Sequence, residues 1–382
     1  ASCCRNVTPG LEVLSNSLRA KKSQEMVLEL LMSDMPDQGY KWTEAGQHGE
    51  LSDWAQAMKV TVRPELQSLR RKQPAADLTH PAMAVNLDAC IQCNRCVRAC
   101  REEQVNDVIG YAHRGEHSQI VFDLQDSMGS STCVACGECV QACPTGALMP
   151  KTQVGSQVVD KKVDSVCPFC GVGCLLTYNI KDNRIVSVDG RDGPANHNRL
   201  CVKGRFGFDY IDHPQRLTVP LIRKAGVPKD PEAIQHLNRN AAHWSDVFRE
   251  ATWEEAFDLI ASKMTSIAKE RGPESFALLK HGSSGGHFEH LFKAYGSDTI
   301  GEPAYAQCRG PREAAFALTF GSWIGSPEPT DIRDSKCLVL IGSHLGENMH
   351  NTQVQEVSEL IDKGNTIITV DPRMSTIASK SK

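Results

Sequence analysis

The chain of 382 residues is 40% hydrophobic and 23% charged, and its net charge is −4. This composition is ordinary for a globular protein, and the length allows two to four domains. The small negative charge argues against nucleic acid or an anionic membrane surface as a partner. No apolar run reaches the roughly eighteen residues of a spanning helix, so no direct membrane insertion is expected.

The number of cysteines, sixteen, is the unusual feature of the composition. Most of them fall in three tight clusters, which is typical of metal ligation rather than of disulfide bonds. Such thiolates suit a reducing compartment, and no signal peptide is recognisable, so we expect a cytoplasmic location. Ala1 is not a natural start, so we also expect an N-terminal piece to be missing.

The first 85 residues carry no metal-binding pattern. Residues 1–20 begin abruptly and contain Cys3, which has no partner set nearby. Residues 34–85 are polar and interrupted by prolines, with a short helix expected at 51–58. Residues 21–33 show apolar side chains at helical spacing and predict a packed amphipathic helix. Its predicted buried face consists of Met26, Val27, Leu30 and Leu31.

Residues 86–150 form the clearest module. Two Cys-x2-Cys-x2-Cys-x3-Cys runs are separated by a 32-residue insert, and the second run ends in Cys-Pro. This is the bacterial two-cluster ferredoxin pattern, in which the fourth cysteine of each run binds the other 4Fe–4S cluster. The exchange has a geometric cause. The first three cysteines of each run surround one cluster, whereas the fourth lies on a helix that points toward the other cluster. One predicted cluster takes Cys90, Cys93, Cys96 and Cys143, and the other takes Cys133, Cys136, Cys139 and Cys100.

Residues 160–215 contain a third set of four cysteines, spaced Cys-x2-Cys-x3-Cys-x26-Cys. A zinc site is the alternative interpretation, but zinc sites usually pair two Cys-x2-Cys units, so a third 4Fe–4S cluster fits better. Lys203 follows the last ligand by two residues, and its ammonium is expected beside the cluster. Alternation around Asp182-Asn183 predicts a hairpin over 175–188. The predicted ligands are Cys167, Cys170, Cys174 and Cys201.

From residue 216 to residue 382 the pattern becomes α/β. Thr252 opens a capping box, and the residues after it have the apolar spacing of a helix. A short strand at 275–279 precedes a glycine-rich loop at 281–287, which by itself indicates phosphate binding only weakly. Strands at 337–341 and 366–370, with a helix near 351–363 between them, predict a βαβ unit. Cys337 lies in an apolar strand and is predicted to belong to the core.

Ligands of open α/β sheets bind beyond the carboxyl ends of the strands. Polar residues follow both strands of the predicted βαβ unit, and they include an acid suited to a guanine edge and an arginine suited to a phosphate. An ordinary loop is the alternative. The candidate ligand-binding residues are Gly342, Ser343, Glu347, Asn348, Asp371 and Arg373.

Cys308 stands apart from the three cysteine clusters. It precedes Gly310, Pro311 and a helix expected to begin near Arg312. A cysteine at a helix start has a lowered pKa and can offer a thiolate to a metal that has open positions. A buried structural cysteine is the alternative interpretation.

The ferredoxin pattern, the sequences CPFCGVGC and CVKG, and a following α/β region with VDPR resemble one family. The resemblance is to catalytic subunits of molybdenum or tungsten bis-pterin oxidoreductases, most closely the cytoplasmic formate dehydrogenase α type. It implies an α+β and α/β multi-domain chain. A two-cluster ferredoxin-like module would precede a small β-rich 4Fe–4S domain and the start of a Rossmann-like α/β pterin-binding domain. The implied cofactors are three 4Fe–4S clusters and Mo or W held by bis-molybdopterin guanine dinucleotide.

The resemblance also implies residue roles. Lys203 would lie between the third cluster and the pterin, and Cys308 would bind Mo or W. Arg309 follows Cys308, and we expect it to position an anionic substrate. These three residues form the predicted catalytic set. Residues 342–348 and 371–373 would contact the guanine dinucleotide.

At the N-terminal end the resemblance implies that residues 1–20 are the tail of a 2Fe–2S ferredoxin-like domain. Cys3 would be the last of its four ligands, and the other three are absent, so that cluster requires the missing N-terminal part. Residues 21–85 would be a helical linker that lacks the His-Cys3 cluster of many relatives. The chain also ends soon after VDPR, where relatives continue, which predicts an internal fragment of a longer subunit.

The first functional hypothesis is oxidation of a small anionic substrate, formate above all. Electrons would pass through three 4Fe–4S clusters to a flavin and iron–sulfur NAD-reducing subunit or another acceptor. Formate dehydrogenases place a histidine after the metal-binding residue, whereas Arg309 stands here. An arginine binds anions well but accepts protons poorly, so a nitrate, arsenate or sulfur oxyanion reductase is the second hypothesis. The third is a non-catalytic subunit that resembles the large iron–sulfur subunit of complex I, which Cys308, Lys203 and VDPR argue against.

Overall fold

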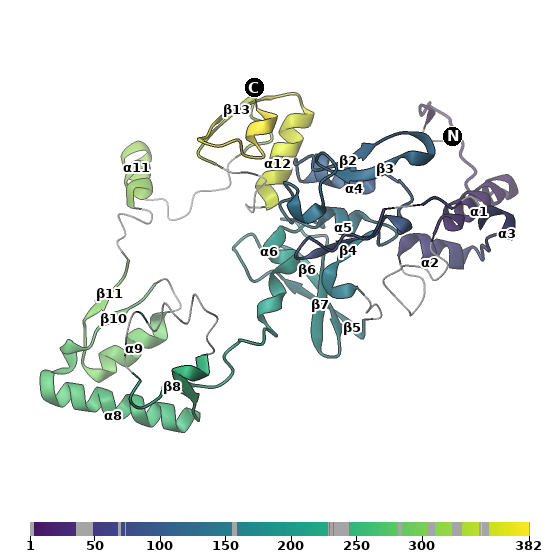
Figure 1. Ribbon diagram of the computed structural model, residues 1–382. Coiled ribbons are helices and arrows are strands. Elements are labelled where there is room, and N and C mark those ends of the chain that lie inside the picture. Colours follow the sequence, from purple (N-terminus) through teal and green to yellow (C-terminus); the bar gives the residue numbers. More distant parts are fainter. Residues whose placement is uncertain are drawn as a thin grey trace. The chain divides into compact units, whose positions relative to one another are not determined.

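The computed structural model of the chain divides into two compact units (Figure 1). One unit comprises Ala1–His213 and Asp331–Lys382, and the other comprises Pro214–Thr330. Every helix in the described part of the chain is too short or too polar to cross a bilayer. The structure describes residues 4–35, 49–67, 70–72, 74–154, 159–227, 229, 232, 244–281, 285–303, 310–322, 331–343, 345 and 351–381.

Among the described residues, three helices precede the cysteine-rich module. The helix predicted at 51–58 is confirmed as α2. The longest of the three, α1, begins after Ser17, whose hydroxyl accepts a hydrogen bond from the Ala20 amide at 3.2 Å. The three helices are α1 (Leu18–Ser33), α2 (Glu50–Ala57) and α3 (Pro64–Gln67).

The amphipathic character of α1 is confirmed, but its predicted buried face is wrong in part. Met26, Val27 and Leu30 are about half exposed. The helix packs through a neighbouring face near its C-terminal end, because α2 and the module core lie against that side. That packed face consists of Leu28, Leu31 and Met32, which contact Met35, Leu51, Ala84, Ala89, Ala147 and Met149.

The first and last strands of the ferredoxin-like module pair with each other. β1 (Met83–Val85) and β4 (Leu148–Pro150) pair antiparallel, so the segment before the first cysteine run lies beside the segment after the second. The insert between the runs forms an antiparallel hairpin. Its strands are β2 (Ile109–Ala112) and β3 (Gln119–Phe122), and the short helices of the cysteine runs are α4 (Arg95–Arg98), the π-helical turn η3 (Ala99–Glu103) and α5 (Glu138–Ala142).

A three-stranded antiparallel sheet follows the module, with strand order β5-β6-β7. The predicted hairpin is confirmed, because Asp182 and Asn183 connect β6 to β7 with φ values of 49° and 59°. Two left-handed residues in succession are what a type I′ turn requires. The elements of this region are β5 (Lys161–Val166), β6 (Leu175–Lys181), β7 (Arg184–Gly190) and α6 (Val202–Phe206).

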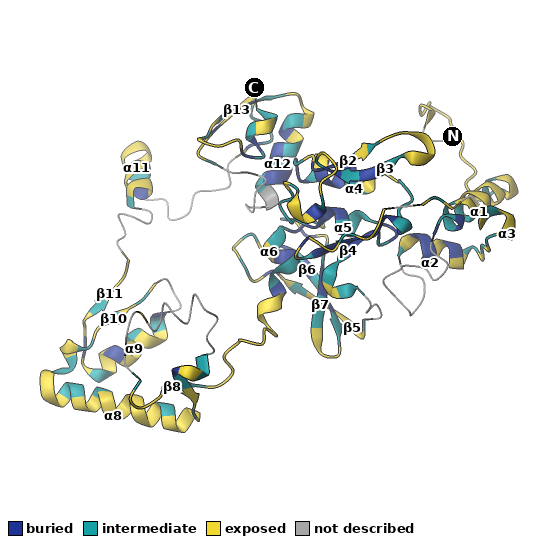
Figure 2. Ribbon diagram, viewed as in Figure 1, coloured by how far each residue is buried: buried dark blue, intermediate teal, exposed yellow. Residues whose placement is uncertain are grey.

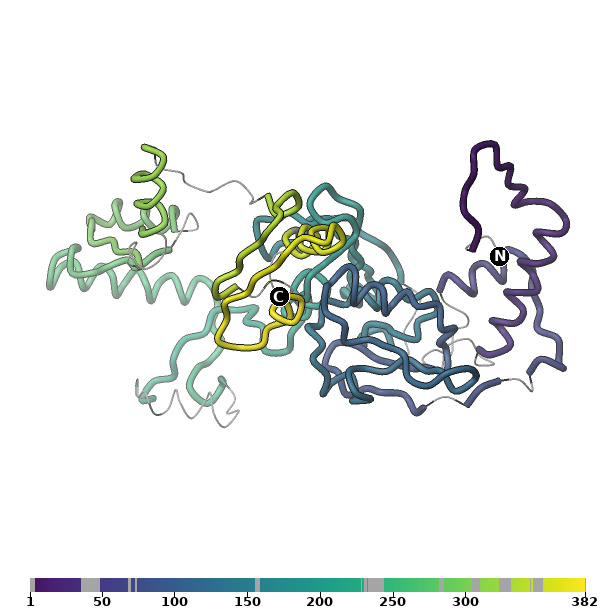
Figure 3. Tube along the Cα trace, turned by 90° about the horizontal axis from the view of Figure 1, so that it is seen from above, coloured from purple at the N-terminus to yellow at the C-terminus, as the bar shows by residue number. Residues whose placement is uncertain are grey.

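The predicted βαβ unit is confirmed near the C-terminal end. β12 (Cys337–Ile341) and β13 (Thr366–Val370) are parallel, and α12 (Asn351–Asp362) connects them. Figure 3 shows the two strands side by side with the helix alongside. The apolar side chains of α12 pack on one face of the strand pair. This core consists of Ile332, Leu340, Leu345, Val357, Leu360, Ile367 and Ile377.

The opposite face of this strand pair is exposed, and it corrects one prediction. Cys337 is exposed rather than buried in the core. Successive strand residues alternate between faces, so Cys337 lies with Val339 and Ile341 on the side away from α12.

In the unit of residues 214–330, the predicted helix cap is confirmed. The Thr252 hydroxyl accepts a hydrogen bond from the Glu255 amide at 3.1 Å and begins α8. Figure 2 shows α8 as largely exposed. The strand predicted at 275–279 covers only two residues. The elements are β8 (Leu221–Arg223), β9 (Phe248–Glu250), α8 (Trp253–Arg271), β10 (Leu278–Leu279), α9 (Gly286–Tyr295), β11 (Ile300–Gly301) and α11 (Gly310–Phe320).

Short 3-10 turns connect many of these elements. They are η2 (Leu87–Ala89), η4 (Gly115–His117), η5 (Met128–Ser130), η6 (Lys151–Gln153), η7 (Gly207–Tyr210), η8 (Trp244–Asp246), η9 (Pro273–Ser275) and η11 (Ala378–Lys380).

Candidate functional site

Four thiols line one cavity of the ferredoxin-like module. Three come from the first cysteine run, and Cys143 comes from the end of the second, so the structure brings together the set that the exchange pattern predicts. The rest of the wall is mainly apolar. The cavity is lined by Leu87, Cys90, Ile91, Gln92, Cys93, Asn94, Cys96, Ile120, Cys143, Pro144, Thr145, Ala147 and Leu148.

A second cavity shows the reciprocal arrangement. Three thiols come from the second run, and Cys100 reaches it from the π-helical turn η3 of the first. A fourth cysteine is therefore exchanged in each direction. This cavity is lined by Cys100, Gln104, Asn106, Val108, Ile109, Met128, Cys133, Val134, Cys136, Gly137 and Cys139.

The two cysteine loops have the same backbone course. In the first loop Gln92 and Asn94 have φ values of 55° and 65°, and in the second Ala135 and Gly137 have values of 57° and 75°. These left-handed residues curl the chain around each cavity. The Gln92 amide donates to the Cys90 sulfur at 3.4 Å, and the Ala135 amide donates to the Cys133 sulfur at 3.3 Å. Inward-pointing amides of this kind stabilise negative charge on sulfur.

Burial dominates the electrostatics of both cavities. It raises the pKa of Cys90 to about 11 and that of Cys96 to about 12, and neighbouring thiols add to both increases. It also raises the pKa of Cys139 well above its ordinary value. A thiolate at these positions therefore needs a cationic partner, and metal binding supplies one because coordinated thiols lose their protons.

The third cysteine set lies at the edge of the β5-β6-β7 sheet. Cys167 and Cys174 are buried and joined by a backbone hydrogen bond of 2.8 Å, whereas Cys170 is exposed and Cys201 is partly buried. Burial raises the pKa of Cys167, and the nearby Cys201 and Cys170 thiols raise it further. The structure thus brings these four predicted ligands into one neighbourhood, with one of them open to solvent.

Asn196 holds the return of the chain toward Cys201, a role that the sequence analysis missed. Its side chain is fully buried, and its Oδ1 accepts from the Leu175 amide at 2.9 Å. Its Nδ2 donates to the carbonyl oxygens of Leu175, Arg191 and Arg199 at 3.0–3.1 Å. Because Leu175 follows Cys174, this clamp fixes the fourth ligand's segment beside the third ligand. An asparagine within a glycine- and proline-containing loop was the available signal.

The thiols of the two cavities line a space rather than meet at a point. In the described ranges, no three His, Cys, Asp or Glu side chains converge as the ligands of a single metal ion do. A zinc ion holds sulfur atoms about 2.3 Å from one centre, whereas a 4Fe–4S cluster takes its thiolates at separate corners. Four thiols spread over the wall of each cavity fit the separate corners of a 4Fe–4S cluster.

The described part of the predicted pterin-contact set lies at one edge of the βαβ unit. The Gly342 amide donates to the Val370 carbonyl at 2.9 Å, so the turn after β12 adjoins the end of β13. Asp371 follows there, and its Oδ1 accepts from the Arg373 amide at 3.0 Å. Ser343 is half-buried beside the same turn. The gathering of Gly342, Ser343, Asp371 and Arg373 agrees with the sequence-based expectation.

Other predicted site residues are placed apart or not described. Lys203 lies on α6, two residues after Cys201, and is exposed. The positions outside the described residues are Cys3, Cys308, Arg309, Glu347 and Asn348.

Three stretches of the chain match known families. Residues 89–147 match the 4Fe-4S dicluster domain, and residues 160–213 match the molybdopterin oxidoreductase Fe4S4 domain. Residues 216–381 match the molybdopterin oxidoreductase family itself.

Curated relatives are similar over most of this chain. One is "Probable oxidoreductase YjgC" of Bacillus subtilis (strain 168), 29% identical over 80% of this chain and 34% of its own length. Another is "Putative formate dehydrogenase SAB2186c" of Staphylococcus aureus (strain bovine RF122 / ET3-1), 28% identical over 68% of this chain and 29% of its own length. The chain thus spans about a third of the length of these relatives.

Among solved structures, acetylene hydratase from Pelobacter acetylenicus is 22% identical over 58% of this chain and 29% of its own, with a TM-score of 0.42.

Two matching families named for molybdopterin oxidoreductases together cover residues 160–213 and 216–381. The chain belongs to the molybdopterin oxidoreductase family.

Proposed function

We propose that this chain is the iron–sulfur and pterin-binding part of a formate dehydrogenase-like oxidoreductase. The observation that carries the proposal is the exchange of Cys100 and Cys143 between two cavities, each of which then has four thiols. Three 4Fe–4S clusters, when bound, would supply single-electron transfer between the pterin site and an acceptor. The thiols, the inward backbone amides and the apolar walls of the module would hold two of them.

The third cluster would be held by Cys167, Cys170, Cys174 and Cys201, with the Asn196 clamp fixing the last ligand. Lys203 follows this set on α6 and would present its charge toward the pterin. The turn at Gly342 and Ser343, with Asp371 and Arg373, would hold a guanine dinucleotide at the sheet edge; we assign Glu347 and Asn348 to the same site.

At the catalytic centre, Cys308 would provide the thiolate ligand of the metal, and it precedes α11 by two residues. A bis-pterin Mo or W centre, when bound, would supply two-electron redox chemistry at the substrate. Arg309 would hold a small anionic substrate through paired N–H donors. Formate is the first candidate, in keeping with the name of the Staphylococcus aureus relative.

An oxyanion reductase is the second candidate, and one observation favours it. Arg309 stands where a formate dehydrogenase would have a histidine, and a guanidinium is suited to binding nitrate, arsenate or a sulfur oxyanion rather than to accepting a proton. In either case a chain of clusters needs an external acceptor or donor. We propose a flavin and iron–sulfur NAD-reducing subunit for this role.

The test begins with the metal content of the anaerobically purified protein. We expect about twelve irons in this region, four for each cluster, together with Mo or W. Dye-linked assays with formate, nitrate and arsenate then separate the two substrates. Cys308→Ala should abolish turnover while the iron content is unchanged, and Cys337→Ala is the matched control.

Two outcomes would contradict the catalytic proposal. Retained turnover in Cys308→Ala would remove this cysteine from the site. Full iron without Mo or W, from cells supplied with both metals, would favour an electron-transfer subunit that resembles the large iron–sulfur subunit of complex I.

A further inference from the structure

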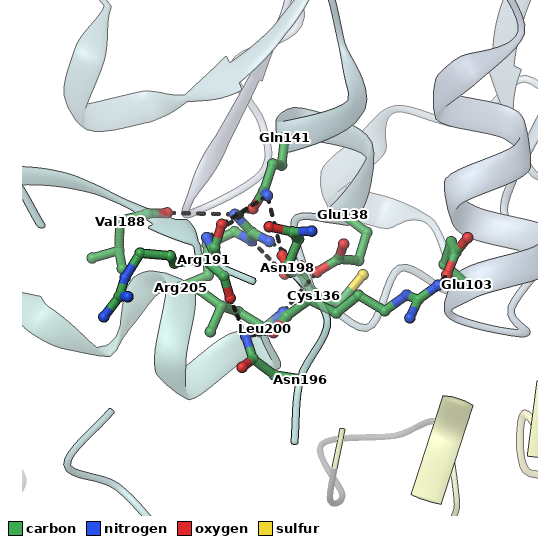
Figure 4. A network of polar contacts seen from close by, with 12 residues as sticks. Glu103, Cys136, Glu138, Gln141, Val188, Arg191, Asn196, Asn198, Leu200 and Arg205 are labelled. Carbon is green, nitrogen blue, oxygen red and sulfur yellow. Dashed lines mark hydrogen bonds and ion pairs between the residues drawn. The ribbon is translucent and has the colours of Figure 1, made fainter. Parts of the chain in front are cut away.

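A buried arginine connects the third cysteine set to the ferredoxin-like module. Arg205 of α6 is only 2% exposed, and its guanidinium enters the second cysteine loop (Figure 4). Nε donates to the Cys136 carbonyl at 3.0 Å, and Nη2 donates to Glu138 Oε1 at 2.8 Å. One side chain from the segment after Cys201 therefore contacts the loop that carries three ligands of the second cavity.

Gln141 completes the binding site of the guanidinium. Arg205 Nη1 donates to Gln141 Oε1 at 2.8 Å and to the Val188 carbonyl at 3.4 Å. Gln141 Nε2 in turn donates to the carbonyl oxygens of Gly190 and Asn198 at 3.1 Å. The arginine is thus held from both sides, by α5 of the module and by the end of β7.

Glu138 makes a direct hydrogen-bonded link between the two ligand sets. The same Oε1 that accepts from Arg205 also accepts from the Leu200 amide at 2.8 Å. Glu138 adjoins Cys139, and Leu200 adjoins Cys201. One hydrogen bond therefore joins the residue beside a ligand of the second cavity to the residue beside the fourth ligand of the third set.

The backbone is shaped for this contact. Gly137 has a φ of 75°, and a Cβ at this position would lie 2.1 Å from Cδ of Arg205. Only glycine combines this left-handed conformation with such a close approach. The arginine stem packs directly on the cysteine loop.

A buried ion pair costs desolvation energy, and structural cohesion alone could be achieved with apolar packing. The reduction potential of an iron–sulfur cluster depends on nearby charge, hydrogen bonds and solvent exposure. A guanidinium without a carboxylate between the two ligand sets would favour the reduced states of the clusters bound there, and a carboxylate alone would disfavour them. When both side chains are present, their effects on the reduction potentials have opposite signs.

We propose that Arg205 and Glu138 are positioning residues for electron exchange between the third ligand set and the second cavity. They fix the separation of the two sets, and each cancels the other's effect on the reduction potentials. This inference rests on the proposed function, because it requires that both sets hold clusters.

The test is an EPR-monitored redox titration of the full chain, purified anaerobically, with iron content measured in parallel. The variants are Arg205→Gln, Glu138→Gln and the double variant. Arg191→Gln is the control, because Arg191 lies near the same strand end, is 38% exposed and pairs with Asp164 on the surface. Glu138→Gln should raise the potentials of the adjoining clusters, and Arg205→Gln should lower them. Each change should be about tenfold in the reduction equilibrium, or about 59 mV for one electron.

The double variant should return the potentials close to those of the unmodified protein. Potential shifts of opposite sign that cancel in the double variant are not expected if the two residues only stabilise the fold. Structural damage would shift the potentials of both single variants in the same direction. Arg205→Lys keeps the charge but loses the planar fork. It should leave the potentials nearly unchanged while it weakens the magnetic interaction between the reduced clusters.

Several results would overturn the inference. Shifts of one sign in both single variants would do so, as would potentials that differ no more than in Arg191→Gln. If Arg205→Gln loses iron, an unchanged magnetic interaction in Arg205→Lys would still refute the positioning role. An unmodified protein that contains no iron in these sets would instead refute the proposed function itself.

Discussion

The two cavities of the ferredoxin-like module and the third cysteine set are built differently. The cavity walls are shared with the module's hydrophobic core, since Leu87, Ile120 and Leu148 belong to both. The third set lies at a sheet edge, is open to solvent at Cys170, and depends on polar side chains such as Asn196 for its shape. Both kinds of site rest on an apolar core, since Cys167 and Cys174 belong to a buried cluster with Leu176. The difference teaches that the third set also takes its shape from a polar clamp, whereas each cavity is completed by a cysteine exchanged between the two runs.

The largest effect should come from removing an exchanged cysteine. Cys143→Ala takes one ligand from the first cavity and leaves the second complete, so we expect a loss of about four irons and a marked loss of stability. Iron analysis and thermal unfolding under anaerobic conditions measure both. Cys100→Ala should do the same to the second cavity, and Cys337→Ala, on an exposed strand face, should change neither. Full iron in Cys143→Ala would disprove the exchange.

Exposed ligands predict which sites oxygen attacks first. Cys170 of the third set and Cys93 of the first cavity are exposed, whereas all four cysteines of the second cavity are buried or partly buried. During timed exposure to air, the EPR signal of the third site should therefore decay before the signal of the second cavity. Cys170→Ala, which removes one third-site ligand, identifies that signal by its absence. Simultaneous decay of these two signals would show that the difference in exposure has no chemical consequence.

Substitutions at Gly137 and Gly171 compare the packing around the second cysteine loop with the packing around the third cysteine set. Gly137→Ala forces a left-handed alanine against Arg205, so it should destabilise the protein by more than about 1 kcal/mol. A Cβ at Gly171, between Cys170 and Cys174, meets no atom within 4 Å, so Gly171→Ala should change stability by less than about 0.5 kcal/mol. Urea unfolding of both variants measures the contrast, and equal values would contradict it.

The cysteine ligand sets could be grouped from the sequence because metal ligation demands one residue type at fixed offsets. The exchange of Cys100 and Cys143 followed from the same rule. Local signals also placed the type I′ hairpin at Asp182-Asn183 and the Thr252 cap. The pairing of β12 with β13 followed from the βαβ pattern.

The network around Arg205 could not be predicted in this way. Arg205 is 67 residues from Glu138 and 69 residues from Cys136 along the chain. No local periodicity links side chains that meet only after two domains pack together. The error at Cys337 has a related cause, because an apolar strand reveals that one face is buried but not whether a second layer covers the other.

The two regions should also differ, by a smaller amount, in how their contribution to stability depends on pH. His80 is buried beside β1, and its Nδ1 accepts from the Ala82 and Met83 amides, both at 3.1 Å. Burial lowers the pKa of His80, and the charge of Lys151 lowers it further. The folded state therefore favours neutral histidine, so this stabilisation is complete above about pH 6.5 and is lost as the pH falls below that value.

His80→Asn keeps a side-chain oxygen that can accept the two amides and does not titrate. Its free energy of unfolding should therefore vary less between pH 7.5 and pH 5.5 than that of the unmodified protein, by about 1 kcal/mol. The control is His197→Asn in the third region, where the side chain is 52% exposed and φ is 43°, a conformation that asparagine tolerates. This control should retain the pH dependence of the unmodified protein. If His80→Asn retained it as well, the enclosed module would not hold its histidine in the neutral form, and the two amides would have to be satisfied in another way at low pH.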